Sequence, residues 1–288
     1  MAVLTAVAPG AVRDAGTRRG GRPLLLLLPA IAVLLIMFVL PVGIIVWRSV
    51  TDPQIGFENY SWILSSNTAM GSLIRTFGIA ALVTGITLAL AYPYAYLMLV
   101  SGPRARAALI LIALLPFWTS LMVRTFAWMI LLQDNGIVAA LTGGQAFLGT
   151  TAGVVIGMTQ VLLPFMVLPL YATMTAVDTE LMPAAQTLGA SPLKAFAQVF
   201  VPLTLPGVAA GCLTVFITAL GFYVTPALLG SPQDAMISQQ IFTQVNGLLQ
   251  WGRGGALGTV LLVLTLVLLG IAALILRYSP LRGGGGRK

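Results

Sequence analysis

The chain has 288 residues, of which 58% are hydrophobic and only 8% are charged, and its mean hydropathy is +0.99. Soluble domains carry about 25% charged residues, so this composition excludes a protein that folds around one aqueous core. The formal net charge is +8, but the basic residues are scattered over short segments, which argues against a nucleic-acid-binding protein. The sequence predicts an all-α, polytopic membrane protein.

Helices that cross about 30 Å of hydrocarbon need about 20 apolar residues, because every backbone group must be hydrogen-bonded within its own helix. Six segments meet this requirement, and together they predict one six-span transmembrane domain over residues 23–277. Residues 1–22 and 278–288 are expected to form cytoplasmic tails. In chain order the predicted spans are about 24–47, 73–100, 107–132, 148–174, 207–229 and 256–276.

The distribution of Lys and Arg predicts the orientation, since positively charged loops stay in the cytoplasm. An even number of spans places both termini on one side of the membrane. The basic residues assigned to that side are Arg13, Arg18, Arg19, Arg22, Arg104, Arg106, Lys194, Arg277, Arg282, Arg287 and Lys288. The opposite side receives only Arg48, Arg75 and Arg253. Both termini and the polar loop over residues 178–206 are therefore expected to be cytoplasmic.

The inventory of reactive side chains argues against an enzyme. The chain has no His, and Cys212 is its one cysteine. The acidic residues, none within a predicted span, are Asp14, Asp52, Glu58, Asp134, Asp178, Glu180 and Asp234. This set predicts no catalytic group, no metal site and no bound cofactor, and the sequence lacks the glycine-rich loop that cradles nucleotide phosphates.

The loop at 178–206 has the local pattern of helix, turn and helix. Asp178 is a suitable N-cap for a helix through Leu188, and Gly189 can adopt the left-handed conformation that ends it. Ser191 followed by Pro192 predicts the start of a second helix.

On the second helix, an apolar face is expected from Leu193, Phe196, Ala197 and Phe200. Considered without further information, this face suits either a docking partner or the membrane surface.

A second group of candidate residues lies within the spans. Arg124 is the one charged residue well inside a predicted span, and it either snorkels in a structural role or lies beside a translocation path. Phe117, Trp118, Phe222 and Tyr223 lie next to Pro or Gly within spans. They either pack between helices or offer cation–π contacts to a passing ammonium group.

Four parts of the chain resemble segments of the spermidine/putrescine-type ABC importer permeases, most closely the first of their two permease subunits. Residues 184–206, with Ala184-Ala185, Gly189, Pro202 and Pro206, resemble the cytoplasmic coupling loop, or EAA loop, of that family. The other three segments are LPFWTSLMVRTFAW at 115–128, LPFMVLPLY at 163–171 and LGFYVTPALLG at 220–230.

The resemblance implies a type I ABC importer permease fold and a pore subunit in the inner membrane of a bacterium. It also implies a dimer of ABC ATPase subunits that uses the ATP, a second permease subunit and an extracytoplasmic substrate-binding protein. The sequence leaves open whether the second permease is a copy of this chain, and the resemblance favours a different chain. The loops predicted outside the membrane are too short to form a receptor domain, which agrees with a separate binding protein. Polyamine-like solutes are the substrate class that the resemblance favours.

In one respect the loop departs from the family. Pro183 stands where the family usually has the Glu of its Glu-Ala-Ala signature, so the first helix is expected to start late or bend. Glu180, one turn earlier, is the candidate for the missing carboxylate contact. The residues assigned to ATPase coupling are Glu180, Pro183, Ala184, Ala185, Gly189, Ser191, Phe196 and Pro202.

The sequence leaves open other solutes and other classes of membrane protein. Related permeases carry opines, other amines, and ferric or organic anions. A different class of protein, an ATP-independent secondary carrier or channel, would need an ion site at the membrane midplane that the sequence does not display. A membrane-embedded scaffold would bind partners without solute flux.

Overall fold

The computed structural model describes residues 22–178 and 180–278, and it divides the chain into two units, 1–44 and 45–288. The described part of the first unit is the N-terminal portion of α1 (Arg22–Thr51), an apolar helix that contains Pro29 and Pro41. The predicted tails, 1–22 and 278–288, lie almost wholly outside the described residues.

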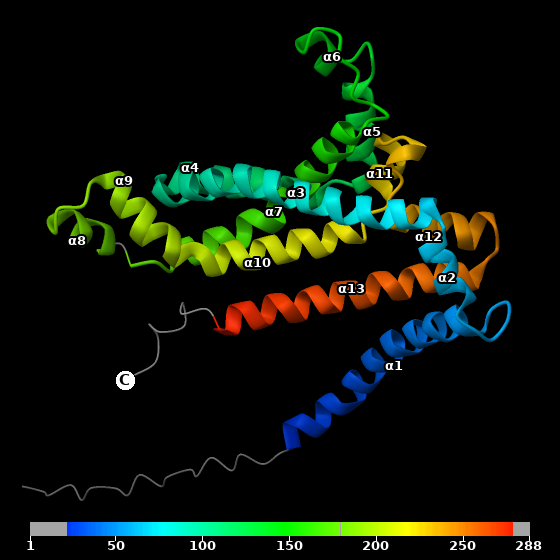
Figure 1. The fold of residues 1–288 in the computed structure, drawn as a ribbon. Helices are drawn as coiled ribbons and strands as arrows, with labels where there is room; N and C mark the ends of the chain where they lie inside the picture. The colour runs from blue at the N-terminus through cyan, green and yellow to red at the C-terminus, as the bar shows by residue number, and fades with distance from the viewer. Residues whose placement is uncertain (1–21, 179, 279–288) are drawn as a thin grey trace, which may run out of the picture. The chain divides into compact units, whose positions relative to one another are not determined.

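The core of the second unit is built from three long helices that lie side by side in Figure 1: α3 (Asn67–Val100), α7 (Thr151–Thr175) and α10 (Val201–Leu220). Helix α7 is the central one, with 67% of its most apolar window buried. Met158, Leu162, Met166 and Leu170 of this helix are fully buried. A helix that is apolar on all sides is buried in this way when neighbours cover it.

Small residues allow these helices to approach closely. A Cβ atom added at Gly211 of α10 would lie 2.6 Å from Met166 Sδ of α7, and one at Gly207 would lie 3.0 Å from the Pro169 carbonyl oxygen. The glycines therefore fix the spacing between α7 and α10.

Shorter elements complete the second unit. They are α2 (Glu58–Ser65), α4 (Pro103–Leu114), η1 (Leu115–Trp118), α5 (Leu121–Leu132), α6 (Ile137–Leu141), α8 (Leu181–Thr187), α9 (Pro192–Ala195), η2 (Phe196–Phe200), α11 (Val224–Leu229), η3 (Pro232–Asp234), α12 (Ile237–Phe242), η4 (Thr243–Gly247) and α13 (Trp251–Tyr278).

The prediction of a multi-span helical protein is confirmed. Five described helices are long and apolar enough to cross a membrane, and a sixth span is present if one bent pair is counted as one. The second predicted span is α3, which begins at Asn67, six residues earlier than predicted. The last span is α13, which begins at Trp251 rather than at 256.

The prediction of a continuous third span over 107–132 is wrong. The pair Pro103–Trp118 and Leu121–Leu132 is bent by 100°. Pro116 has no N–H to donate, and Thr119 and Ser120 adopt ψ angles of 142° and 138°, outside the helical range,. Pro116 predicts a broken backbone hydrogen bond at this point, but the bend of 100° was not predicted.

The predicted bounds of the fifth span, 207–229, are also wrong. The helix runs without interruption from Pro192 to Leu220 and includes Pro202 and Pro206. After Leu220 the chain turns at Gly221 and forms the separate helix α11, which packs against Gly157 of α7 through Thr225 and Leu229.

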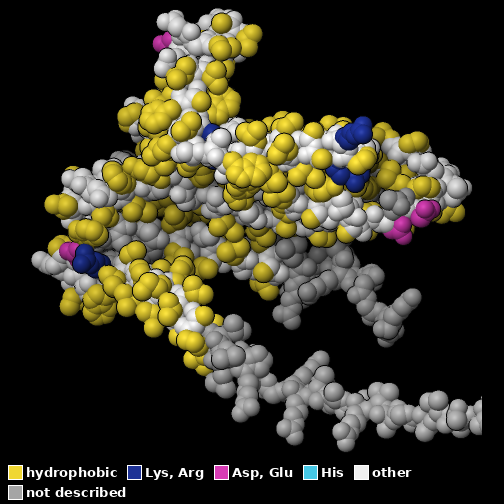
Figure 2. All heavy atoms as spheres, turned by 180° about the vertical axis from the view of Figure 1, so that it is seen from behind, with side chains coloured by type: hydrophobic (Ala, Val, Ile, Leu, Met, Phe, Trp, Pro, Cys, Tyr) yellow, Lys and Arg dark blue, Asp and Glu magenta, His cyan; other side chains and the backbone are white. Residues whose placement is uncertain are grey.

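The surface agrees with a membrane environment. On the face drawn in Figure 2, hydrophobic side chains cover most of the surface and few charged side chains interrupt them. A soluble monomer rarely exposes contiguous apolar surface of this extent.

Candidate functional site

The first helix of the polar loop at 178–206 begins later than the sequence predicts. Asp178 is not the N-cap of the first helix: α8 begins at Leu181, and Glu180 occupies the N-cap position without a side-chain cap. Asp178 Oδ1 instead accepts a hydrogen bond from the Glu180 N–H (3.0 Å), which forms a turn before the helix. Pro183 is thereby the third helical residue, where its missing N–H leaves no bond unmade. The expected late start of this helix is confirmed.

Gly189 ends α8 as predicted, with φ at +93°. The Gly189 N–H donates to the Gln186 carbonyl (3.0 Å) and the Ala190 N–H donates to the Ala185 carbonyl (3.1 Å). These two bonds form a Schellman motif, which a residue in the left-handed region closes.

Ser191 caps the second helix as predicted, since its Oγ accepts a hydrogen bond from the Lys194 N–H (3.4 Å). From Pro192 the helix continues into α10 through a π turn at Phe196–Phe200. The Val201 N–H reaches back to the Phe196 carbonyl, one residue further than in an α-helix, just before Pro202,. The second helix of the loop and the fifth span are therefore one continuous helix.

The predicted apolar face of this helix is split. Phe196 and Phe200 stack on each other at 5.5 Å, and both meet Tyr96 of α3 edge-on, so they pack within the chain. Leu193 is 77% exposed. Leu188, which the sequence analysis did not single out, is 89% exposed and lies directly before Gly189. The exposed apolar side chains of the loop are thus the leucines rather than the aromatics.

A second candidate site lies at the break of the bent span. There η1 and the start of α5 meet α7 and the end of α10, and they line an open pocket of about 210 Å³. Its walls include Phe117, Leu121, Arg124, Phe165, Thr218 and Phe222.

The pocket gathers only part of the predicted path residues. Phe117, Arg124 and Phe222 line it. Trp118 is 71% exposed, and Tyr223 packs against Phe242 with the two rings tilted and their centroids 5.2 Å apart; neither residue lines the pocket. Phe165 and Thr218 were missed. Phe165 follows Pro164 within a predicted span and so carries the same signal as the four selected aromatic residues, whereas Thr218 has no such signal. Phe165 lies edge-on to Phe117 at 5.3 Å.

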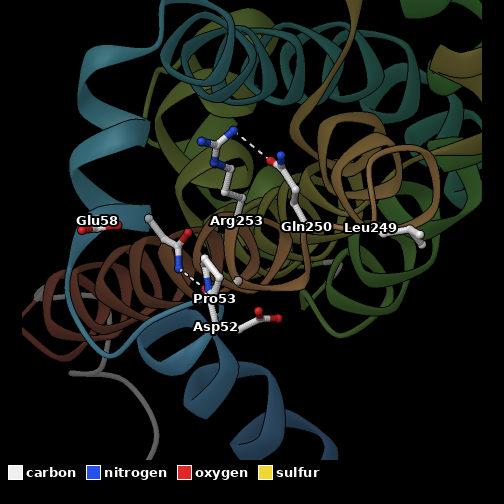
Figure 3. A pocket seen from close by; sticks show the side chains of 8 residues that line it. Asp52, Pro53, Glu58, Leu249, Gln250 and Arg253 are labelled. Carbon is white, nitrogen blue, oxygen red and sulfur yellow. Dashed lines mark hydrogen bonds between the residues drawn. The ribbon is translucent and has the colours of Figure 1, made fainter.

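A third region, here called the α2/α13 cap, comprises residues 48–66 and 249–255 (Figure 3). The Asn59 side-chain amide donates to the carbonyl oxygens of Ser49 (2.9 Å) and Asp52 (2.8 Å). The Arg253 guanidinium lies over the Trp62 ring at 4.7 Å and donates to Gln250 Oε1 (2.8 Å). In Figure 3 the Asp52 and Glu58 carboxylates point away from each other, so they do not form a joint cation site.

The segment before α12 is held by a polar network around Asp234. This carboxylate accepts hydrogen bonds from the hydroxyl groups of Thr151 and Ser231, and Arg75 donates to the neighbouring Ala235 carbonyl (3.1 Å). Burial acts to raise the pKa of Asp234, but the hydrogen bonds from Thr151 and Ser231 and the charge of Arg75 together hold that pKa below its ordinary value. The carboxylate links α3, the start of α7 and the segment before α12.

Asp234→Asn is expected to loosen this link, because an amide carries no charge for Arg75 and accepts fewer hydrogen bonds. The expected loss is about 1 kcal/mol of unfolding free energy, after allowance for solvent screening of a partly exposed group. In the wild type, the folded pKa lies below the unfolded one, so this stabilisation is present above about pH 4 and is lost as the pH falls through the folded pKa. Hydrogen exchange over residues 231–242 measures the loss of stability in Asp234→Asn. Asp134→Asn, at an exposed loop carboxylate, is the control. Equal exchange in both variants would contradict the assignment.

The chain was compared with known proteins. No model of a known protein family matches it. It is 32% identical over 205 residues to the spermidine/putrescine transport system permease protein PotB of Escherichia coli (strain K12), a match that covers 68% of this chain and 74% of that protein. It is also 32% identical over 222 residues to PotB of Haemophilus influenzae, which covers 75% of this chain and 77% of that protein.

Among solved structures, the chain resembles a subunit of a bacterial alginate ABC transporter in complex with its alginate pentasaccharide-bound periplasmic protein. The TM-score is 0.73 with 18% sequence identity, over 88% of this chain and 93% of that chain. A likeness at this identity shows the fold, which is that of type I ABC importer permeases. Together with the identity to the two curated relatives, it shows that this chain belongs to the ABC importer permeases, as a transport subunit that is not itself the ATPase.

Proposed function

We propose that this chain forms one half of the translocation pore of a bacterial inner-membrane ABC importer for polyamine-like solutes. A second, different permease forms the other half, and a dimer of ATPase subunits binds and hydrolyses the ATP. A separate extracytoplasmic binding protein delivers the solute. The loop at 178–206 is the ATPase-coupling site, and Phe117, Arg124 and Phe222 lie beside the path.

The rigid connection of the loop to the core carries the coupling proposal. Any displacement of α8 and Ser191 passes into the continuous helix from Pro192 to Leu220. The stack of Phe196 and Phe200 on Tyr96 passes the same displacement to α3. Alternating access requires an ATPase movement to reach the pore helices, and this arrangement provides a mechanical route.

The arrangement of basic residues supports cytoplasmic termini and a cytoplasmic loop. Arg106 and Asp178 line one pocket, so the α3–α4 turn and the polar loop lie at the same end of the second unit. Arg48 and Arg253 belong to the α2/α13 cap at the other end of α3. The positive excess that favours cytoplasmic termini comes from the terminal segments of the sequence, which contain Arg13, Arg18, Arg19, Arg22, Arg277, Arg282, Arg287 and Lys288,.

Leu188 and Leu193 are proposed to enter the ATPase subunit. The double variant Leu188→Ser, Leu193→Ser should weaken ATPase binding by at least about tenfold, because burial of one Leu contributes about 1.5–3 kcal/mol. Titration of the purified ATPase subunit against the chain in nanodiscs measures the dissociation constant. Leu141→Ser, at a leucine 82% exposed in α6, is the matched control. Equal loss in the control, or no loss in the double variant, would contradict the docking surface.

The identity to the two spermidine/putrescine permeases carries the proposal for the solute. The complex isolated through the tagged chain, reconstituted in liposomes with its own binding protein, should take up radiolabelled putrescine or spermidine only when ATP is enclosed. A 100-fold excess of unlabelled spermidine should abolish uptake. ATP-dependent uptake of a different solute, with no effect of spermidine, would overturn the solute and leave the permease function standing.

One observation favours a second candidate, a solute that carries an acid group: the charged group in the pocket is the guanidinium of Arg124. An opine or an organic anion suits this charge better than a polyamine. The ATP-independent carrier is set aside, because the chain belongs to the ABC importer permeases.

A further inference from the structure

The pocket at the helix break presents one charged group, and that group is positive. Arg124 lies one turn into α5 and lines the pocket. Among residues 22–178 and 180–278, no acidic residue lines the pocket. Anything that rests in this pocket therefore meets a fixed cation and no carboxylate.

Within the described residues, Arg124 lacks a full set of partners. Its Nε atom is buried, and no described group accepts a hydrogen bond from it. A buried N–H of a charged group without an acceptor is unfavourable, and an acceptor in the pocket would remove the deficit. An anion supplies the strongest acceptor, because a charge-assisted hydrogen bond is about twice as strong as a neutral one.

The surroundings strengthen the attraction for an anion. Phe117, Phe165 and Leu162 form apolar walls, and charges interact more strongly beside apolar groups than in bulk water. The helix α5 starts at Leu121 in the same wall, and Ser120 gives it no side-chain cap. The partial positive charge of this helix N-terminus adds to that of Arg124.

The size of the pocket limits the ligand. A volume of about 210 Å³ exceeds the roughly 30 Å³ that one water occupies in the liquid. It admits a carboxylate, a phosphonate or a halide ion with some water.

We infer that the pocket formed by Phe117, Arg124, Phe165 and Thr218 is an anion site, which binds a single acid group of the solute or an inorganic anion such as chloride. The placement of this site on the solute's route rests on the proposed function. The binding of an anion does not, because it can be measured without transport.

The test uses the purified wild-type complex and three variants in detergent at constant ionic strength. The thermal unfolding midpoint is followed during titration with sodium chloride, 4-aminobutyrate and 1,4-diaminobutane. Arg124→Gln removes the charge, Arg124→Lys keeps it, and Arg104→Gln is the matched control at an exposed arginine of α4.

An anion should raise the midpoint of the wild type and of Arg104→Gln, with a dissociation constant of about 1–10 mM. The same titration should weaken at least tenfold in Arg124→Gln and persist in part in Arg124→Lys. A response to 4-aminobutyrate only identifies a subsite for the solute's acid group. A response to chloride only identifies an inorganic counter-anion, and competition between the two identifies one shared site.

A second measurement avoids the variants. Crystals of the wild-type complex grown in sodium bromide should give an anomalous peak within hydrogen-bonding distance of the Arg124 guanidinium. The absence of this peak, or stabilisation by 1,4-diaminobutane that disappears in Arg124→Gln, would overturn the anion site. Failure of putrescine uptake would instead contradict only the proposed solute and would leave the anion site standing.

Discussion

Gly189→Val is expected to reduce ATP-dependent uptake by at least about tenfold while the transmembrane helices stay folded. Gly189 has φ at +93°, and a Cβ placed there meets nothing within 4 Å. The effect is therefore one of backbone conformation only: a β-branched residue in the left-handed region is unfavourable by about 1–2 kcal/mol. Relief of that strain breaks the Schellman bonds and changes the angle between α8 and Ser191. Uptake into liposomes and ATP hydrolysis by the assembled complex are measured together.

The matched variant is Gly189→Asn, because Asn adopts the left-handed conformation more readily than any branched residue. It should retain most of the uptake. If Val and Asn behave alike, the conformation of Gly189 is not what positions the loop.

Gly252→Ala is expected to have the largest effect on stability. A Cβ atom at Gly252 would lie 1.8 Å from the Asp52 carbonyl oxygen and 2.7 Å from Asn59 Nδ2. The first of these is a backbone atom, so α13 must move away from the chain at 48–52. Overpacking of this kind reduces the free energy of unfolding by about 1–3 kcal/mol or more. The bonds from Asn59 to Ser49 and Asp52 should be lost with it, which hydrogen exchange over residues 57–66 detects.

The same helix contains the control. A Cβ at Gly270 of α13 meets nothing within 4 Å, so Gly270→Ala should be neutral or slightly stabilising. A similar loss of stability in both variants would show that α13 itself is sensitive to substitution, and the close contact at Gly252 would then explain nothing.

Much of the fold could be predicted from composition and length, because membrane spans depend on apolar segments rather than on long-range contacts. The helices α3, α7 and α13 were predicted in this way. The 100° bend between Trp118 and Leu121 was not predicted, because residues 107–132 are long and apolar enough for one span and Pro116 alone does not specify how far a helix bends,. The fifth span was misplaced for another reason: Pro202 and Pro206 were assigned to the polar loop, but the helix continues through both, and a π turn accommodates Pro202.

Within the candidate sites, residues specified by local sequence were predicted, and residues placed by tertiary packing were not. Gly189 and Ser191 have conformations that their own residue types specify, and both were predicted. Phe165 and Thr218 enter the pocket through tertiary packing, which local sequence does not encode. Phe196 and Phe200 were predicted to belong to an exposed apolar face. In the structure they pack against Tyr96, about 100 residues earlier in the chain, and local sequence does not encode this contact.

The central claim is that the loop at 178–206 connects this permease to an ATPase. Affinity purification of the tagged wild-type chain in mild detergent, followed by mass spectrometry and an ATPase assay, tests it most directly. The account predicts recovery of a subunit with a phosphate-binding glycine-rich loop, in a complex that hydrolyses ATP, and loss of that subunit from the Leu188→Ser, Leu193→Ser variant. Recovery of the chain without an ATPase under several solubilising conditions, or equal recovery of the ATPase with the double variant, would contradict the claim.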